Sequence, residues 1–291
     1  MSETVLATPA AAPARRRDGL RGLLRKPLFV VSALITLLYL AMAAFPGLFT
    51  SVDPRACSLA FSGVGPSSGH PFGYDLQGCD YLANIIYGTR SSISIGLLVT
   101  VATFVLAAVF GGLAGYFGGL VDGVVSRTAD IMFGLPFIVA AIVVLNMFPQ
   151  RDVLSVSLVL IVLGWPGGMR YMRGSVLKVR NLEYVQAARV LGSGHTRVLL
   201  SHVMPNSLTP LIVLKTLEVG AVIAAEAALT FLGVGLQPPA ISWGLQLSAA
   251  HSQWQAHPHL VIFPSIFLSL AVLAFVVLGD SLRDALDPKE R

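Results

Sequence analysis

The chain has 291 residues, of which 55% are hydrophobic and 12% are charged, with a formal net charge of +5. A soluble domain carries roughly twice that share of charged residues, so the composition excludes this class and predicts an integral membrane protein. The basic groups do not gather in one patch, which argues against nucleic-acid binding and favours attraction to anionic lipid headgroups.

Residues 1–27 are rich in alanine and proline before a cluster of arginines, which predicts a flexible cytoplasmic arm. A cleaved signal peptide is the alternative. It is disfavoured because the first apolar run is long and no clean small-residue cleavage site follows it.

Six apolar runs of about 20 residues follow, each long enough to cross a hydrocarbon core of about 30 Å. Backbone groups cannot stay unpaired in lipid, so the runs predict an all-α fold with six transmembrane helices. The predicted spans are Leu28–Phe49, Ile93–Tyr116, Val124–Phe148, Val153–Tyr171, Leu208–Leu232 and Leu260–Gly279. They divide the chain into a first helix (28–49), an extracytoplasmic segment (50–92), a five-helix core (93–279) and a cytoplasmic tail (280–291).

Lysine and arginine predict the orientation of these spans. With both termini in the cytoplasm, sixteen basic residues lie inside and three lie outside, namely Arg55, Arg90 and Arg151, while Lys215 falls within a span. This asymmetry follows the positive-inside rule.

The segment 50–92 contains both cysteines of the chain, Cys57 and Cys79. Outside the cytoplasm a disulfide can persist, and it would fasten a loop that is too small to form a core. Two free thiols are the alternative, because the sequence does not place the two Cα atoms within bonding reach.

Glycine and proline mark packing and bending within the spans. Gly111, Gly115 and Gly119 recur at every fourth residue, which predicts close helix packing against this chain or a partner. Pro136, Pro166 and Pro264 predict kinks.

The fifth span contains three ionisable residues, Lys215, Glu218 and Glu226. Such residues face protein or water, so all three are candidates for a translocation path. The alternative is a structural Lys215–Glu218 pair with Glu226 as a hydrogen-bonding residue. At the third span, Asp122 and Asp130 suggest a helix-terminus role.

A polar island, Glu183–Pro205, separates the fourth and fifth spans. Its first part predicts a short helix with Tyr184, Ala187, Ala188 and Leu191 on one face and Gly192 as its end. So short a helix is marginal alone in water, which indicates a groove on a partner. A helix lying in the lipid interface is the alternative, although its apolar face is short.

The same residues carry a family resemblance. The spacing of Tyr184, Ala187, Ala188, Gly192 and Pro205 resembles the cytoplasmic coupling motif of ABC importer permeases. HPFGYDLQGCDYLANIIYGTRSSISIG, GYFGGLVDGVVSRTADIMFGLPF, EAALTFLGVGLQPPAISWG and LGDSLRDALDP resemble the C-type subunit of the oligopeptide/dipeptide group. Gln186 stands where the motif has glutamate, and Cys79 stands where an arginine is common.

The resemblance implies a type I ABC importer permease fold and a multi-pass subunit of the bacterial cytoplasmic membrane. It implies a homologous second permease, ABC ATPase subunits or a fused tandem ATPase, and an extracytoplasmic peptide-binding protein as partners. A coupling loop at about 172–206 would dock on the ATPases. The candidate ATPase-coupling residues are Glu183, Tyr184, Gln186, Ala187, Ala188, Leu191, Gly192 and Pro205.

This chain is then not an enzyme, and no catalytic, metal or cofactor site is expected in it. No lysine follows a glycine, so the sequence contains no P-loop. ATP and magnesium would bind the partner ATPases.

Two other classes of membrane protein are alternatives. An ion-coupled secondary transporter could use Glu218 or Glu226, but it predicts paired internal repeats that the sequence does not show. A structural membrane protein would not need charges in the fifth span. The substrate stays open among dipeptides, longer peptides, glutathione, nickel chelates and cell-wall peptides, with peptide as the expectation.

Overall fold

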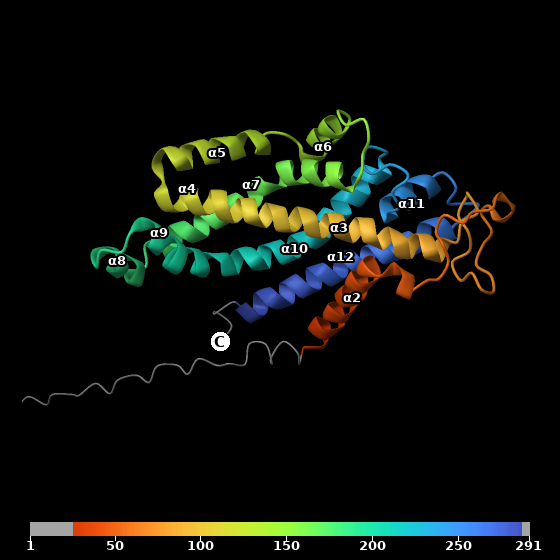
Figure 1. Ribbon diagram of the computed structural model, residues 1–291, viewed down its shortest axis with the longest axis horizontal. Helices are drawn as coiled ribbons and strands as arrows, with labels where there is room; N and C mark the ends of the chain where they lie inside the picture. The colour runs from red at the N-terminus through yellow and green to blue at the C-terminus, as the bar shows by residue number, and fades with distance from the viewer. Residues whose placement is uncertain (1–25, 287–291) are drawn as a thin grey trace, which may run out of the picture.

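The structure is a computed structural model that describes residues 26–286, and within that range it contains helices and no strand (Figure 1). The predicted arm 1–27 and the end of the predicted tail therefore lie largely outside the described residues. The helices are α2 (Pro27–Ala44), α3 (Tyr81–Leu106), α4 (Gly112–Phe117), α5 (Gly119–Phe133), α6 (Phe137–Leu145), α7 (Val153–Val179), α8 (Glu183–Val190), α9 (His195–Val198), α10 (Met204–Phe231), α11 (Trp243–Ala250) and α12 (His259–Leu286).

Two π-helical segments make longer units of these helices. Ala107–Gly111 joins α3 to α4, and Leu199–Val203 joins α9 to α10. Within residues 26–286, five helical units are long and apolar enough to cross a membrane. They are Pro27–Ala44, Tyr81–Phe117, Val153–Val179, His195–Phe231 and His259–Asp284.

These units form an elongated bundle (Figure 1). Helices α8 and α9 lie at one end, here named the α8 end. Helix α11 and the segment from Thr50 to Asp80 lie at the other, here named the disulfide end. The apolar side chains of α2, such as Leu28, Leu34 and Leu37, are largely exposed, as expected of a helix that faces lipid. The prediction of an all-α, multi-pass membrane protein is confirmed.

The third predicted span, Val124–Phe148, is not one continuous helix. Its residues belong to α5 and α6, whose axes meet at 87° across a short break. Pro136 precedes α6, lacks a backbone N–H and disfavours the helical conformation of Leu135 before it. By contrast, Pro166 and Pro264 lie inside the continuous helices α7 and α12.

Other spans extend beyond their apolar runs, as α3 and α7 show. Helix α3 begins at Tyr81, within the segment predicted as a loop, because the Asp80 carboxylate accepts a hydrogen bond from the Ala83 N–H at 2.8 Å. Helix α7 continues to Val179, past the predicted end at Tyr171. Hydrophobicity marks the buried middle of a helix, while polar caps decide where its ends lie.

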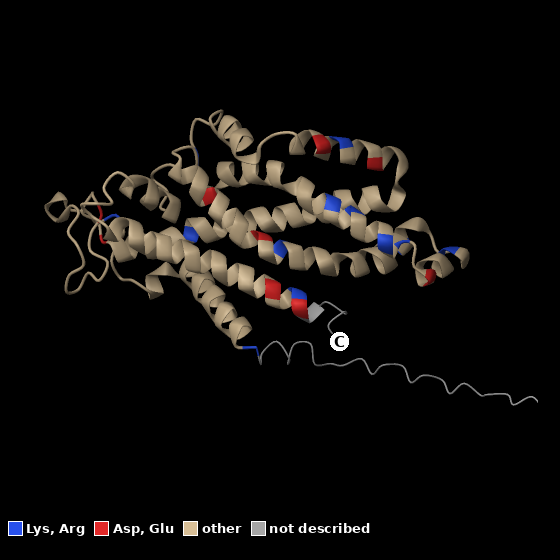
Figure 2. Cartoon of the chain, turned by 180° about the vertical axis from the view of Figure 1, so that it is seen from behind, with Lys and Arg blue, Asp and Glu red and all other residues tan. Residues whose placement is uncertain are grey.

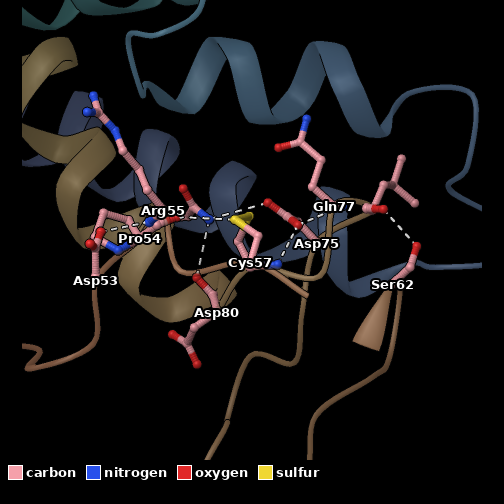
Figure 3. Close-up of a disulfide and its surroundings, with 11 residues drawn as sticks. Asp53, Pro54, Arg55, Cys57, Ser62, Asp75, Gln77 and Asp80 are labelled. Atoms are coloured by element: carbon pink, nitrogen blue, oxygen red, sulfur yellow. Dashed lines mark hydrogen bonds between the residues drawn. A yellow bond between two sulfur atoms is a disulfide. The ribbon is translucent and has the colours of Figure 1, made fainter. Parts of the chain in front are cut away.

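Cys57 and Cys79 form a disulfide at the disulfide end (Figure 3). The bond ties the start of the loop to the residue before the Asp80 cap. The Asp75 carboxylate accepts hydrogen bonds from the N–H groups of Gln77 at 2.8 Å and Cys79 at 2.9 Å. Phe72 stacks on Phe263 of α12 with ring centroids 4.0 Å apart. Covalent, polar and aromatic contacts thus hold the loop against the bundle.

The predicted glycine face is a contact within the chain. A Cβ at Gly111 would lie 2.6 Å from the Met169 carbonyl oxygen, and one at Gly115 would lie 2.9 Å from the Arg173 carbonyl oxygen. Both glycines therefore let the α3–α4 unit approach the α7 backbone. Gly119 has no neighbour within 4 Å of such a Cβ, so its inclusion in this face was wrong.

We expect replacement of both cysteines by serine to loosen the loop locally. The two cysteines are 22 residues apart in the sequence. A disulfide that closes a loop of this length stabilises the folded state by about 3 kcal/mol. Hydrogen exchange of amides between residues 58 and 78 should accelerate, by up to about a hundredfold. Amides in the middle of α7 serve as the internal control. Unchanged exchange in the loop would show that its other contacts suffice.

Alanine at Gly111 should destabilise the protein, because its methyl group meets the α7 backbone. The expected cost is about 1–3 kcal/mol, measured as a lower Tm of the purified protein in detergent. Gly123→Ala on α5 is the matched control, since no atom lies within 4 Å of the added methyl group and alanine favours a helix. Equal Tm values for the two variants would contradict the close contact.

Candidate functional site

Helix α8 is the short helix that the polar island predicts. It spans Glu183–Val190, and Gly192 follows it with φ of 85°, a left-handed conformation that suits glycine. The N–H of Ser193 donates to the Ala188 carbonyl at 3.1 Å, and the N–H of Gly192 donates to that of Arg189 at 2.9 Å. These bonds satisfy carbonyls at the helix end, as in a Schellman motif.

One side chain anchors α8 to the bundle. Val185 is fully buried and belongs to a cluster with Met172 and Val176 of α7 and Val198 of α9. The sequence analysis did not predict this role for Val185, because it considered only the face of the helix that would meet a partner. Val185 is an apolar residue outside that face, which is the pattern that could have indicated an anchor.

A polar cluster around Tyr116 fastens the same helix to the end of α4. The guanidinium carbon of Arg189 lies 5.2 Å from the centre of the Tyr116 ring. The Tyr116 hydroxyl lies 3.4 Å from His195 Nδ1, and Arg180 donates to the carbonyls of Gly115 at 2.6 Å and Tyr116 at 3.2 Å. Helix α8 is therefore attached to three helical units, through α4, α7 and α9.

The opposite side of α8 is free. Tyr184 and Leu191 are 44% and 86% exposed, Ala187 is exposed as well, and Ala188 is half-buried. Val190, at 87% exposed, adds an apolar residue that the sequence reasoning left out. Small residues between larger apolar ones leave a shallow, uncovered surface, here named the α8 face and made of Tyr184, Ala187, Ala188, Val190 and Leu191.

The remaining residues of the predicted coupling set have other surroundings. Glu183 is exposed in the first turn of α8, where a negative charge complements the helix dipole. Gln186 donates through Nε2 to the Asn181 carbonyl at 3.1 Å, so it is engaged with its own chain. Pro205 is exposed and lies near the start of α10, within the continuous helical unit that begins at His195.

The three ionisable residues of α10 differ in exposure. Lys215 is buried, donates to Thr103 Oγ1 of α3 at 3.1 Å and pairs with Glu218. Gly168 of α7 makes room for it, because a Cβ there would lie 2.8 Å from Lys215 Cε. The Glu218 side chain is 32% exposed. Of the three residues, Glu218 therefore has the carboxylate that reaches the surface of the bundle.

Glu226 lies within the bundle. It is fully buried, and its Oε1 accepts a hydrogen bond from Thr230 at 2.9 Å. The same hydroxyl accepts from the N–H of Leu236 at 3.1 Å, which holds the chain leading to α11. This arrangement matches a structural residue more closely than a group on a path.

Two ion pairs hold α5 against α7. Asp122 pairs with Arg173, and Asp130 pairs with Arg170. The predicted helix-terminus role fits Asp122, which lies in the first turn of α5. It does not fit Asp130, which lies in the last turn, where the helix dipole does not favour a negative charge. Their arginine partners are some 40 to 50 residues away, and no local pattern indicated them.

Comparison with known proteins places this geometry in context. The family model described as the binding-protein-dependent transport system inner membrane component matches residues 107–291. The dipeptide transport system permease protein DppC of Bacillus subtilis (strain 168) is 37% identical over 273 residues, which cover 92% of this chain and 84% of that protein.

Other relatives have similar sequence identity and coverage. The glutathione transport system permease protein GsiD of Pectobacterium atrosepticum is 35% identical over a region that covers 94% of this chain and 91% of that protein. The oligopeptide transport system permease protein OppC of Bacillus subtilis (strain 168) is 34% identical, with 91% and 86% covered. A crystal structure of an amino acid ABC transporter with histidines superposes with a TM-score of 0.53 at 15% identity, over 69% of this chain and 92% of that one. At that identity the structural likeness concerns the fold alone.

Lys215→Met should destabilise the protein, because it leaves the Glu218 carboxylate without its cation inside a span. The loss should be smaller than the roughly 3–5 kcal/mol of a fully enclosed pair, since Glu218 is partly exposed. The second change Glu218→Gln should restore part of the Tm in detergent. Additive effects of the two changes would show that the residues do not interact.

Proposed function

Because the chain belongs to the family of binding-protein-dependent transport system inner membrane components, we propose that it forms half of the translocation path for short peptides in an ATP-driven importer. Its role as an ABC importer permease follows from the family. Membership also favours this role over an ion-coupled transporter that uses Glu218 or Glu226. The substrate, the partners and the orientation are our proposals.

The α8 face carries the proposal. An exposed helix that is fixed to the bundle by Val185 and Tyr116, yet uncovered on its other side, suits docking in a groove of a cytoplasmic ATPase subunit or a fused tandem ATPase. ATP and magnesium would bind that partner, and this chain would hydrolyse nothing. Movement of α8 would reach α4 through Tyr116 and α10 through α9, in a two-state change of the bundle.

This docking sets the orientation that we propose. The α8 end would lie in the cytoplasm of a bacterium, with both termini on that side of the cytoplasmic membrane. Figure 2 shows most basic residues of the described chain on the half of the bundle that carries α8. This distribution supports the orientation through the positive-inside rule.

Helix α5 supports a homologous second permease as partner. It exposes Arg127, at 86%, and Asp130, at 47%, which pair with each other at 3.8 Å, along with apolar Val124 and Ile131. Charged groups within a span face protein or water, because lipid does not solvate them. A second permease on this side would cover α5 and enclose the path. Glu218 is our candidate for a carboxylate on that path.

Peptide as the substrate rests on the relatives, whose names specify dipeptides, oligopeptides and glutathione. These are short peptides or a close analogue of one. A binding protein outside the membrane would deliver the peptide to the disulfide end. The decisive test is ATP-driven uptake of a labelled dipeptide by vesicles that contain both permeases and the ATPases, with the binding protein added outside.

Within that assay, Ala187→Trp should reduce ATP-driven uptake by about tenfold or more, since a loss of 1.4 kcal/mol in docking suffices for a tenfold change. Tryptophan fits the free monomer, because Ala187 is exposed, but it would not fit the proposed groove. Ala187→Ser keeps the side chain small and should preserve uptake. Full uptake with Ala187→Trp would refute the docking role of the α8 face.

A further inference from the structure

A cavity of about 460 Å³ lies at the disulfide end, beside the ends of α3 and α12. Its walls come from the loop before α3, the first turns of α3, the stretch that leads into α11, and α11 itself. The volume lies within the range of pockets that bind small molecules. Neither the α8 face nor the charged residues of α10 take part in it.

The cavity has one carboxylate without a cation. Asp75 is half-buried, and its Oδ1 accepts from two backbone N–H groups, while Oδ2 accepts from Asn84 Nδ2 at 3.3 Å. No ion pair of the described chain includes Asp75. Burial raises the pKa of this carboxyl, against the opposing effect of its backbone hydrogen bonds. An ammonium group at Oδ2 would stabilise the charged form.

The cavity also has one guanidinium without an anion. Arg55 donates through Nη2 to the Pro239 carbonyl at 3.2 Å, which leaves other N–H groups free, and it forms no ion pair within residues 26–286. Figure 3 shows Asp75 beside the disulfide and the Arg55 side chain pointing away from both. The two residues line the same cavity but do not pair with each other. Opposite charges held apart in this way suit a ligand with a charge at each end.

The rest of the lining suits the middle of such a ligand. Gln246 also lines the cavity, but both of its amide atoms are buried, so they do not face a ligand in this conformation. The disulfide, Pro238 and Leu245 supply apolar walls that can contact a side chain.

We propose that this cavity is a binding site for a short zwitterionic peptide, with the terminal ammonium at Asp75 and the terminal carboxylate at Arg55. The proposal rests on the proposed function for the class of substrate. It adds a site on the permease itself, separate from the binding protein and from the path. The site would hold a peptide at the mouth of the bundle before translocation.

The test uses the complete complex of permeases and ATPases without the binding protein, and the probe is L-alanyl-L-phenylalanine. Binding is measured by calorimetry for this dipeptide, its N-acetyl form and its C-terminal amide. Each blocked form should bind the unchanged protein about tenfold more weakly, as expected for the loss of one charged hydrogen bond. This comparison requires no variant that could misfold.

Variants then assign the two ends. Asp75→Asn should weaken binding of the free dipeptide about tenfold but should not weaken the N-acetyl form further. Arg55→Gln should weaken the free dipeptide but not the amide. Asp152→Asn is the matched control, because Asp152 caps α7 at the same end of the bundle and lies outside the cavity, and asparagine caps helices equally well.

Several outcomes would overturn the inference. The first two are absence of dipeptide binding and equal binding of the free and blocked forms. The third is that the Asp75 and Arg55 variants bind the dipeptide as the unchanged protein does but bind the binding protein more weakly. The last result would make the cavity a docking surface for that protein. ATP-driven uptake by the unchanged complex separates the two proposals: uptake without cavity binding refutes this site alone, and cavity binding without uptake refutes the proposed function alone.

Discussion

The middle of the bundle depends on the interactions of the buried Lys215 ammonium group. Within a span, water does not solvate a charge, so the protein must supply its partners. Thr103 comes from α3, Glu218 from the next turn of α10, and Gly168 of α7 provides space. The three helices are therefore positioned by one side chain. Its carboxylate partner, Glu218, is held at the surface of the bundle.

A second set of contacts connects this middle region to the α8 end. Tyr116 lies between Arg189 and His195, and Arg180 fixes the backbone next to it. These residues join α8 to the α3–α4 unit, while α9 joins it to α10. Both units contribute to the surroundings of Lys215. The α8 face is thus connected to the surroundings of Lys215 by packed helices.

Much of the architecture could be predicted from the lengths of apolar runs, because lipid requires each run to satisfy its own backbone. Pro136 predicted a kink at the break, but its angle of 87° could not be predicted, since a sharply bent span has the same hydropathy as a straight one. In the candidate site, too, one part could be predicted from the sequence and another could not. Ala187, Ala188 and Gly192 form a local pattern that sequence can reveal. Tyr116 is 79 residues from its partner His195, and such contacts depend on the fold.

The two π-helical segments also bear on how such a protein can evolve. A π-helical turn contains one more residue than an α-helical turn, so it absorbs an insertion without rotating the helix beyond it. Ala107–Gly111 and Leu199–Val203 each lie between a long membrane helix and its short extension toward α8. Residues on the two sides can therefore change length or register separately. The end that meets one partner can diverge while the side chains that surround Lys215 keep their places.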